Sequence, residues 1–164
     1  MAYQKLQAGG ALAVIPSDHI NIPSPSDFIA ANSGAITGTD PNYRILAGTT
    51  LLSYDLKPGD IIYHDTGPVA LRVVRIDSAT TLHVDNGAGT APANALIGSY
   101  KIYRNRNQAC VLYVGTTGNL TLKMAGDTGR NSVLIKSAAV GYHPLQVIRV
   151  AATGTTADDI VALW

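Results

Sequence analysis

Two copies of the tripeptide Asp-Thr-Gly are the residues of this chain whose types could most directly do chemistry. They are Asp65-Thr66-Gly67 and Asp127-Thr128-Gly129. Aspartic proteases place two such motifs so that two carboxylates about 3 Å apart share one proton in a buried, apolar setting. Here His64 precedes the first copy and Pro68 follows it, while Arg130 follows the second. These polar and turn-forming neighbours predict solvated hairpin turns rather than a catalytic pair.

The tripeptide Ser17-Asp18-His19 contains the three residue types of a hydrolytic triad. Neighbours in an extended chain point to alternate sides, so they cannot form the hydrogen-bond relay that a triad requires. The histidines have no second ligand at metal-binding spacing; they are His19, His64, His83 and His143. We therefore expect no catalytic residue, no cofactor-binding residue and no metal site.

Aromatic and basic residues interleave near residue 100, where they could stack bases or sugars and hold phosphates. They are Tyr100, Lys101, Tyr103, Arg104 and Arg106, with Tyr54 and Tyr63 as further aromatic candidates. This pattern makes a glycan- or nucleic-acid-binding module an alternative interpretation of the chain. The net charge of +1 predicts no long-range attraction to nucleic acid or anionic lipid. We favour a solvated strand end and linker over residues 101–108.

The elements that must position these residues are short strands, because turn residues punctuate the whole chain. There are 16 glycines and 8 prolines, with many Thr, Val, Ile and Tyr residues between them, a pattern typical of an all-β fold. Residues 11–15 predict a strand, and Pro16, Pro23 and Pro25 predict a stiff extended tether after it. Ser26 and Asp27 predict a cap for a short helical turn over residues 28–31, ending near Gly34.

The turn spacing between residues 51 and 103 predicts a small, strongly bent β-barrel of the SH3 or OB type. Alternation places Leu71, Val73 and Arg75 on one face of its longest strand. Turns are expected at Pro58-Gly59, Gly67-Pro68, Asp77-Ser78 and Asn86-Gly87. Further strands are expected at 110–114, 119–124, 132–137, 145–150 and 160–164. The expected fold is a β-sandwich base, built from residues 1–35 and 106–164, with a barrel over residues 36–105 inserted.

Charged residues make up only 14% of the chain, where a soluble domain typically carries about 25%. No apolar segment approaches the roughly 20 residues of a membrane helix. Because unpaired charges are costly at interfaces, this composition favours a protein that hides surface against copies of itself or partners. The lone Cys110 lies in an apolar run and is expected to be buried and inert. The short apolar stretch near the N-terminus predicts no secretory signal.

The last residues are apolar on both faces of a predicted strand, since Ile160, Ala162 and Trp164 alternate with Val161 and Leu163. A solvated edge strand would instead alternate with polar residues, so we expect this strand to be covered on both sides. The alternative is an amphipathic last helix capped by Thr155 or Thr156. Trp164 itself could be an interface anchor or an internal plug.

The last part of the chain, residues 109–164, which we call the closing block, resembles the C-terminal signature of small tailed-phage virion proteins. This family contains the head-spike base proteins of phages and gene transfer agents. The resemblance covers roughly residues 11–20 and 109–164. The segments that carry it are Pro16-Ser17-Asp18, LYVGTTG (112–118), PLQVIRV (144–150), ATGTTA (152–157) and IVALW (160–164). The barrel stretch lies between them and has no counterpart in shorter relatives.

This resemblance implies a virion structural protein without catalysis, seated on the capsid as a head-decoration or spike-base protein. The expected partners are copies of itself in a trimer or pentamer, the major capsid protein or another virion protein, and a fibre or spike protein. Nucleic acid and membrane are not expected partners. The alternatives are a tail, neck or fibre-adaptor virion protein, or glycan binding through the barrel. We expect assembly in the host bacterial cytoplasm and a subunit interface that includes Pro16, Asp18, Ile160, Leu163 and Trp164.

Overall fold

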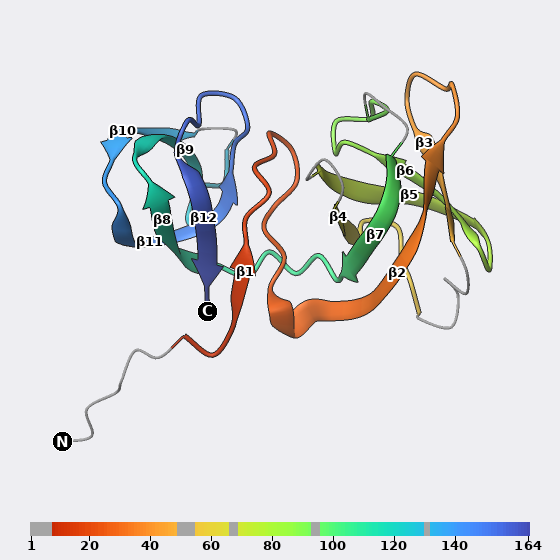
Figure 1. Cartoon of the computed structure of the whole chain (residues 1–164), viewed down its shortest axis with the longest axis horizontal. Coiled ribbons are helices and arrows are strands. Elements are labelled where there is room, and N and C mark those ends of the chain that lie inside the picture. Colours follow the sequence, from red (N-terminus) through yellow and green to blue (C-terminus); the bar gives the residue numbers. More distant parts are fainter. Residues whose placement is uncertain (1–7, 49–54, 66–68, 93–95, 130–131) are drawn as a thin grey trace.

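The protein is all-β and consists of a six-stranded sheet and a closed six-stranded barrel (Figure 1). The structure, a computed structural model, describes residues 8–48, 55–65, 69–92, 96–129 and 132–164. We call the six-stranded sheet, which is formed by both ends of the chain, the base. The predicted fold class, a sandwich-like base with a small inserted barrel, is confirmed.

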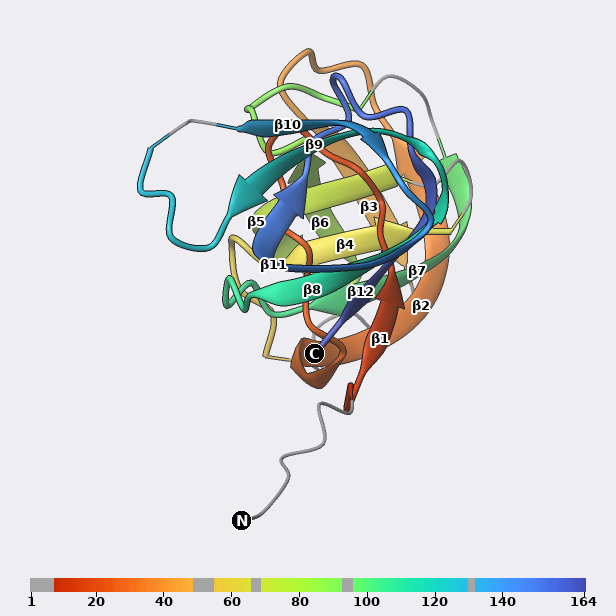
Figure 2. The ribbon, with the colours of Figure 1, turned by 90° about the vertical axis from the view of Figure 1, so that its left-hand side faces the viewer.

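The base is an antiparallel sheet with the strand order β1-β12-β8-β11-β9-β10. Its long strand β11 bends, so that its first half pairs with β8 and its second half pairs with β9. This bend folds the sheet around a core that includes Leu112, Leu120 and Leu122 (Figure 2). The strands are β1 (Ala11–Ala13), β8 (Cys110–Thr116), β9 (Gly118–Met124), β10 (Val133–Ala138), β11 (Gly141–Val150) and β12 (Asp158–Leu163).

The barrel closes in the order β2-β3-β6-β5-β4-β7, with β7 pairing back onto β2. Its interior is filled by buried aliphatic side chains such as Ile36, Leu46 and Leu71. A closed barrel has no unpaired sheet edge to offer another chain. The strands are β2 (Phe28–Thr37), β3 (Arg44–Gly48), β4 (Ile61–His64), β5 (Val69–Ser78), β6 (Thr81–Asp85) and β7 (Leu96–Tyr103).

The predicted helical turn over residues 28–31 is wrong, because the barrel strand β2 begins at Phe28. The local capping signal is real, but it belongs to the 3₁₀ turn η1 (Pro25–Asp27), whose cap is the Ser24 side chain. Pairing with β7, for example Ala30 opposite Ile102, then holds the next residues extended. Consequently the predicted boundary between residues 35 and 36 falls inside β2, and the barrel strands run from Phe28 to Tyr103.

Alternation in β5 holds for Leu71 and Val73, which are buried in the barrel, but fails at Arg75. A register shift between Val73 and Arg75 exchanges the inward- and outward-facing positions of the strand. As a result Ile76, and not Arg75, packs on the barrel core. The turn expected at Asp77-Ser78 lies two residues later, at residues 79–80. The turn expected at Gly67-Pro68 lies outside the described residues.

The tether between β1 and η1 runs between the base and the barrel (Figure 1). A separate apolar cluster forms there, in which Ile20 and Ile15 of the tether pack with Tyr63 and Tyr103 of the barrel. The predicted linker over residues 101–108 is partly wrong, because β7 extends through Tyr103. The actual link begins at Arg104, whose guanidinium binds the buried Asp60 carboxylate at 3.1 and 3.2 Å.

Candidate functional site

The end of the chain forms a strand, β12, as the alternating apolar pattern predicts, and not a helix. It lies inside the sheet between β1 and β8, with Leu163 opposite both Ala11 and Val111. The Trp164 backbone N–H donates to the Gly10 carbonyl at 3.1 Å, which ties the last residue to the lead-in of β1. The chain segments before and after the barrel in sequence therefore pair with each other in the base.

The two faces of β12 have different surroundings. Ile160 and Ala162 point inward and are buried in the base core. Val161 and Leu163 point outward and are half-buried. One apolar face is thus covered by the chain itself, whereas the other lies on the outside of the sheet.

Apolar side chains continue across the outside of the sheet in two rows. One row runs from Ala13 through Val161 and Tyr113 to Tyr142, and the other links Ala11, Leu163 and Val111. We call these seven residues the outer face. The rings of Tyr113 and Tyr142 meet edge to face at 5.3 Å, and Tyr142 remains 74% exposed. An aromatic side chain this exposed, in a contiguous apolar patch, is typical of an interaction surface.

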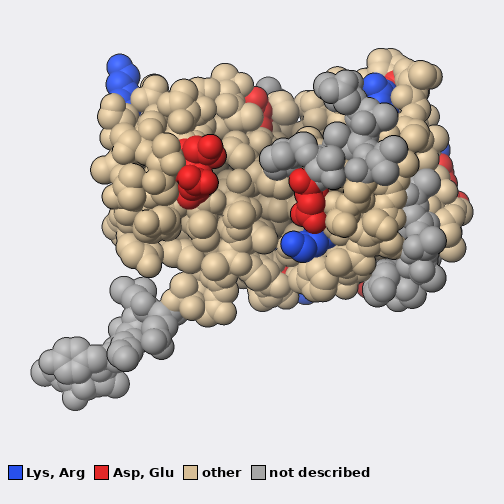
Figure 3. Space-filling view, viewed as in Figure 1, with Lys and Arg blue, Asp and Glu red and all other residues tan. Residues whose placement is uncertain are grey.

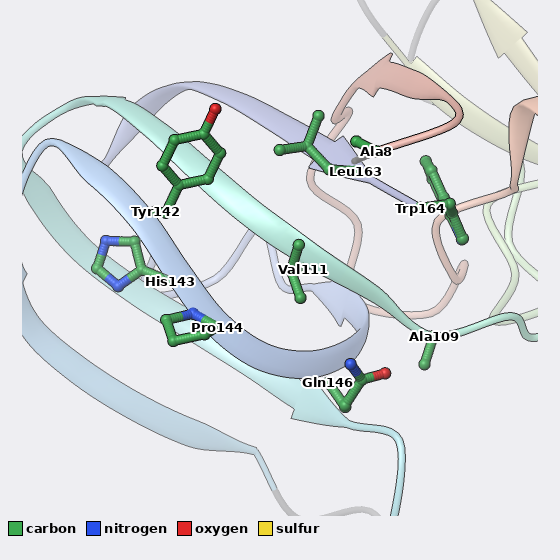
Figure 4. A pocket seen from close by; sticks show the side chains of 9 residues that line it. All are labelled: Ala8, Ala109, Val111, Tyr142, His143, Pro144, Gln146, Leu163 and Trp164. Carbon is green, nitrogen blue, oxygen red and sulfur yellow. The ribbon is translucent and has the colours of Figure 1, made fainter. Parts of the chain in front are cut away.

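A groove of about 510 Å³ lies along the outer face and reaches Trp164 (Figure 4). Leu163 and Trp164 stand on one side of it, Tyr142 and Pro144 stand on the other, and Val111 lies between them. The indole also packs against the base core, so Trp164 is both a plug and a groove wall. Its Nε1 is buried and has no hydrogen-bond partner among the described residues, so the ring acts through its apolar body.

The remaining predicted interface residues do not line this groove. Ile160 is 5% exposed inside the core, and Pro16 is exposed on the tether. Both oxygens of the Asp18 carboxylate accept hydrogen bonds from Thr153, one from the backbone N–H at 2.8 Å and one from the hydroxyl at 2.7 Å. Although burial alone would raise it, these bonds hold the pKa of Asp18 below its usual value. Asp18 thus fastens the tether to the loop between β11 and β12.

Sequence reasoning did not place Val111, Tyr113 or Tyr142 on the outer face, or Pro144 in the groove beside it. A signal for two of them exists in β8, whose residues Cys110–Val114 are apolar at every position. This is the same two-sided pattern that marks β12 as covered on both faces. Tyr142 and Pro144 carry no such signal, because they join the surface only through the pairing of β11 with β8.

The predicted aromatic surface of the barrel is wrong for the residues that the structure describes. Tyr63, Tyr100 and Tyr103 are 4%, 0% and 3% exposed, so they cannot stack on an external base or sugar. Tyr100 lies in the barrel core, where burial raises its pKa to about 12. Tyr54 lies outside the described residues.

The two Asp-Thr-Gly copies lie in different parts of the molecule. Asp65 follows β4 of the barrel and is exposed, while Asp127 follows β9 of the base. Thr66 and Gly67 lie outside the described residues. Nor does Ser17-Asp18-His19 form a relay, because the Ser17 hydroxyl accepts from the backbone N–H groups of His19 and Ile20. Within the described ranges, no group of three or more His, Cys, Asp or Glu residues is placed to hold a metal ion.

Cys110 is buried, as predicted, and its thiol donates to the Val147 carbonyl at 3.3 Å. Burial raises the pKa of this thiol to about 12, which disfavours the reactive thiolate. No helix among the described residues has the length and apolar character to cross a membrane.

No protein-family model matches this chain, and neither does any curated protein or solved structure with which it was compared.

Proposed function

We propose that this protein is a structural component of a bacteriophage virion. It assembles through the outer face into a symmetric homo-oligomer on the capsid, as a head-decoration or spike-base protein without catalysis. The observation that carries the proposal is the outer face itself, in which one apolar row crosses four neighbouring strands, a second crosses three, and both end at residues that line the Trp164 groove. The resemblance of the closing block to tailed-phage virion proteins supports the same role.

The low charge of the base supports burial against other subunits. The side of the molecule on which β12 lies in front is mostly uncharged over the base, apart from an acidic cluster and a few charged side chains at the upper edge (Figure 3). None of the seven outer-face residues is charged, they include two tyrosines, and the groove along them also reaches Trp164. Interface centres are depleted in charge and enriched in Tyr and Trp. A symmetric oligomer repeats this contact in every subunit, which multiplies the apolar area removed from water.

The number of subunits in the oligomer would indicate its position on the virion, because the symmetry of the oligomer should match that of the site. A pentamer fits a fivefold vertex, as expected of a spike base, and a trimer fits a decoration or a fibre adaptor. In either arrangement the barrel, which is closed on itself, is the part free to face the major capsid protein, a fibre or the solvent.

Native mass spectrometry of the full chain tests the proposal. We expect a trimer or pentamer for the wild type and a monomer for Tyr142→Asp, because a charge on the outer face cannot be buried unpaired. The matched control is Val74→Asp, which puts the same charge on a 41% exposed position of the barrel and leaves the oligomer intact. A monomeric wild type at high concentration, or equal dissociation of both variants, contradicts the proposal.

A further inference from the structure

A second cleft, of about 720 Å³, lies where the base, the tether and the barrel meet. It shares no lining residue with the Trp164 groove. Lys123 and Arg149 of the base form one wall, Asp18 and His19 of the tether lie beside them, and Gly87 of the barrel closes another side. The cleft is therefore built by three segments that are far apart in the sequence.

Lys123 and Arg149 face each other directly in this cleft. They are cross-strand partners in the pairing of β9 with β11, and both are half-buried. Side chains at opposed positions have Cβ atoms about 5 Å apart, and like charges placed this way destabilise a sheet. Two cations in such a position need an opposite charge nearby.

The described part of the chain does not supply that charge by direct contact. Neither Lys123 nor Arg149 forms an ion pair or a side-chain hydrogen bond with another described residue. Burial lowers the pKa of Arg149, and the charge of Asp18 partly counters this effect. However, both oxygens of Asp18 are already engaged by Thr153. One carboxylate at a distance thus faces two partly desolvated cations.

The barrel side of the cleft depends on a glycine. Gly87 has a φ of +89°, and a Cβ there would lie 2.8 Å from side-chain atoms of both His19 and Ile20. The barrel loop can approach the tether this closely only because residue 87 has no side chain. The width of the cleft is therefore set by packing of the barrel loop on the tether.

We propose that this cleft binds an oxyanion, a carboxylate or phosphate group, between Lys123 and Arg149. A guanidinium offers a planar pair of donors to such a group, and an ammonium adds a point charge. The Thr121 side chain also lines the cleft and can contribute a hydroxyl donor. The cleft is larger than one oxyanion needs, so it has room for part of the molecule that carries the group. The site is independent of the proposed oligomer.

An NMR titration of the full-length protein tests this site with two probes, sodium phosphate and sodium acetate, each balanced with sodium chloride to constant ionic strength. We expect saturable shifts of the Arg149 side-chain and β9 backbone signals in the wild type. The β9 backbone shifts are lost in Arg149→Gln, and both sets of shifts are lost in Lys123→Gln. The matched control, Lys136→Gln, removes an exposed lysine of β10 and keeps the response.

Saturation by phosphate alone, acetate alone or both supports the site and identifies the group. Shifts that do not saturate, or that persist unchanged in Arg149→Gln, overturn it. Thermal unfolding without phosphate or acetate gives a second readout. Lys123→Gln should unfold at or above the midpoint temperature of Lys136→Gln, since it removes like-charge repulsion. A clearly lower midpoint contradicts the premise that the two cations repel each other.

Discussion

The barrel and the base differ in how far their charged groups are paired and their apolar groups are covered. Every ion pair between described residues lies within residues 27–106, that is, in the barrel and its link to the base. Among the described residues, Lys123 and Arg149 of the base form no ion pair, and the base keeps an apolar outer face in contact with water. The barrel also closes on itself, whereas the base is an open sheet that ends at β1 and β10.

This difference indicates which part of the molecule leaves surface for a partner to cover. The barrel contains most of the ion pairs and has no unpaired sheet edge, so it offers less for a partner to cover. The base buries one face of its sheet and leaves the other apolar, which is the arrangement expected when a partner supplies the missing cover. Substitutions in the two parts should therefore have different effects on stability and on assembly.

Replacing Asp85 with alanine should destabilise the barrel most. The Asp85 side chain is buried, binds the Arg72 guanidinium through two hydrogen bonds, and accepts the N–H groups of Gly87 and Gly89. Removing it leaves these donors without their acceptor, and we expect a loss of about 4 kcal/mol in the free energy of unfolding. Urea denaturation measures this. Asp127→Ala, in a base loop, should change the same quantity by less than about 0.5 kcal/mol.

Two neighbouring residues of β8 separate folding from assembly. Leu112 is fully buried in the base core, so Leu112→Ala should cost about 3 kcal/mol of unfolding free energy. Val111 belongs to the outer face, so Val111→Ser should cost less than about 1 kcal/mol and instead weaken the oligomer. Urea denaturation and native mass spectrometry of both variants check this. The contrast between inner and outer face is broken if Val111→Ser destabilises the chain as much as Leu112→Ala.

A methyl group at Gly118 should disturb the base where β9 begins beside the segment that precedes β12. A Cβ at this position would lie 2.3 Å from the Ala157 backbone nitrogen, closer than any real contact allows. We expect Gly118→Ala to lower the free energy of unfolding by about 2 kcal/mol. At Gly126 a Cβ would meet no described atom within 4 Å, so Gly126→Ala serves as the neutral control. Thermal unfolding of the two variants, compared side by side, decides the point.

Asp18→Asn should have the smallest effect, because it weakens two hydrogen bonds at the surface. We expect a loss of about 1 kcal/mol near neutral pH. The folded-state pKa of Asp18 is lowered, so its contribution is present above the unfolded value of about 4 and disappears as the pH falls through the folded value. The stability difference between wild type and variant should therefore shrink below about pH 4. A difference that stays constant down to pH 2 would show that the charge of Asp18 does not stabilise the tether.

Local patterns were enough to predict much of the fold. The five strands predicted between residues 110 and 164 follow from alternation between Gly-rich turns. The burial of Cys110 follows from its apolar run. The errors fall where pairing overrides a local signal. Phe28 begins a strand because β7 lies beside it. The inward and outward positions of β5 exchange at a bulge that no residue type in the strand predicts. The barrel tyrosines were misplaced for two reasons. Tyr100 points into the barrel core, which an alternating strand does not reveal, and Tyr63 and Tyr103 are covered by the distant tether.

By itself, the sequence determined that this chain is an all-β protein with few charges and a last strand that is apolar on both faces. These properties depend on residue type and on a period of two along the chain, and both are local. Only the tertiary structure decided that the outer face extends from β12 to Tyr142, and that Lys123 stands opposite Arg149. Both juxtapositions depend on how β11 bends and changes partner from β8 to β9. That register is set by packing between distant segments, so no short stretch of residues encodes it.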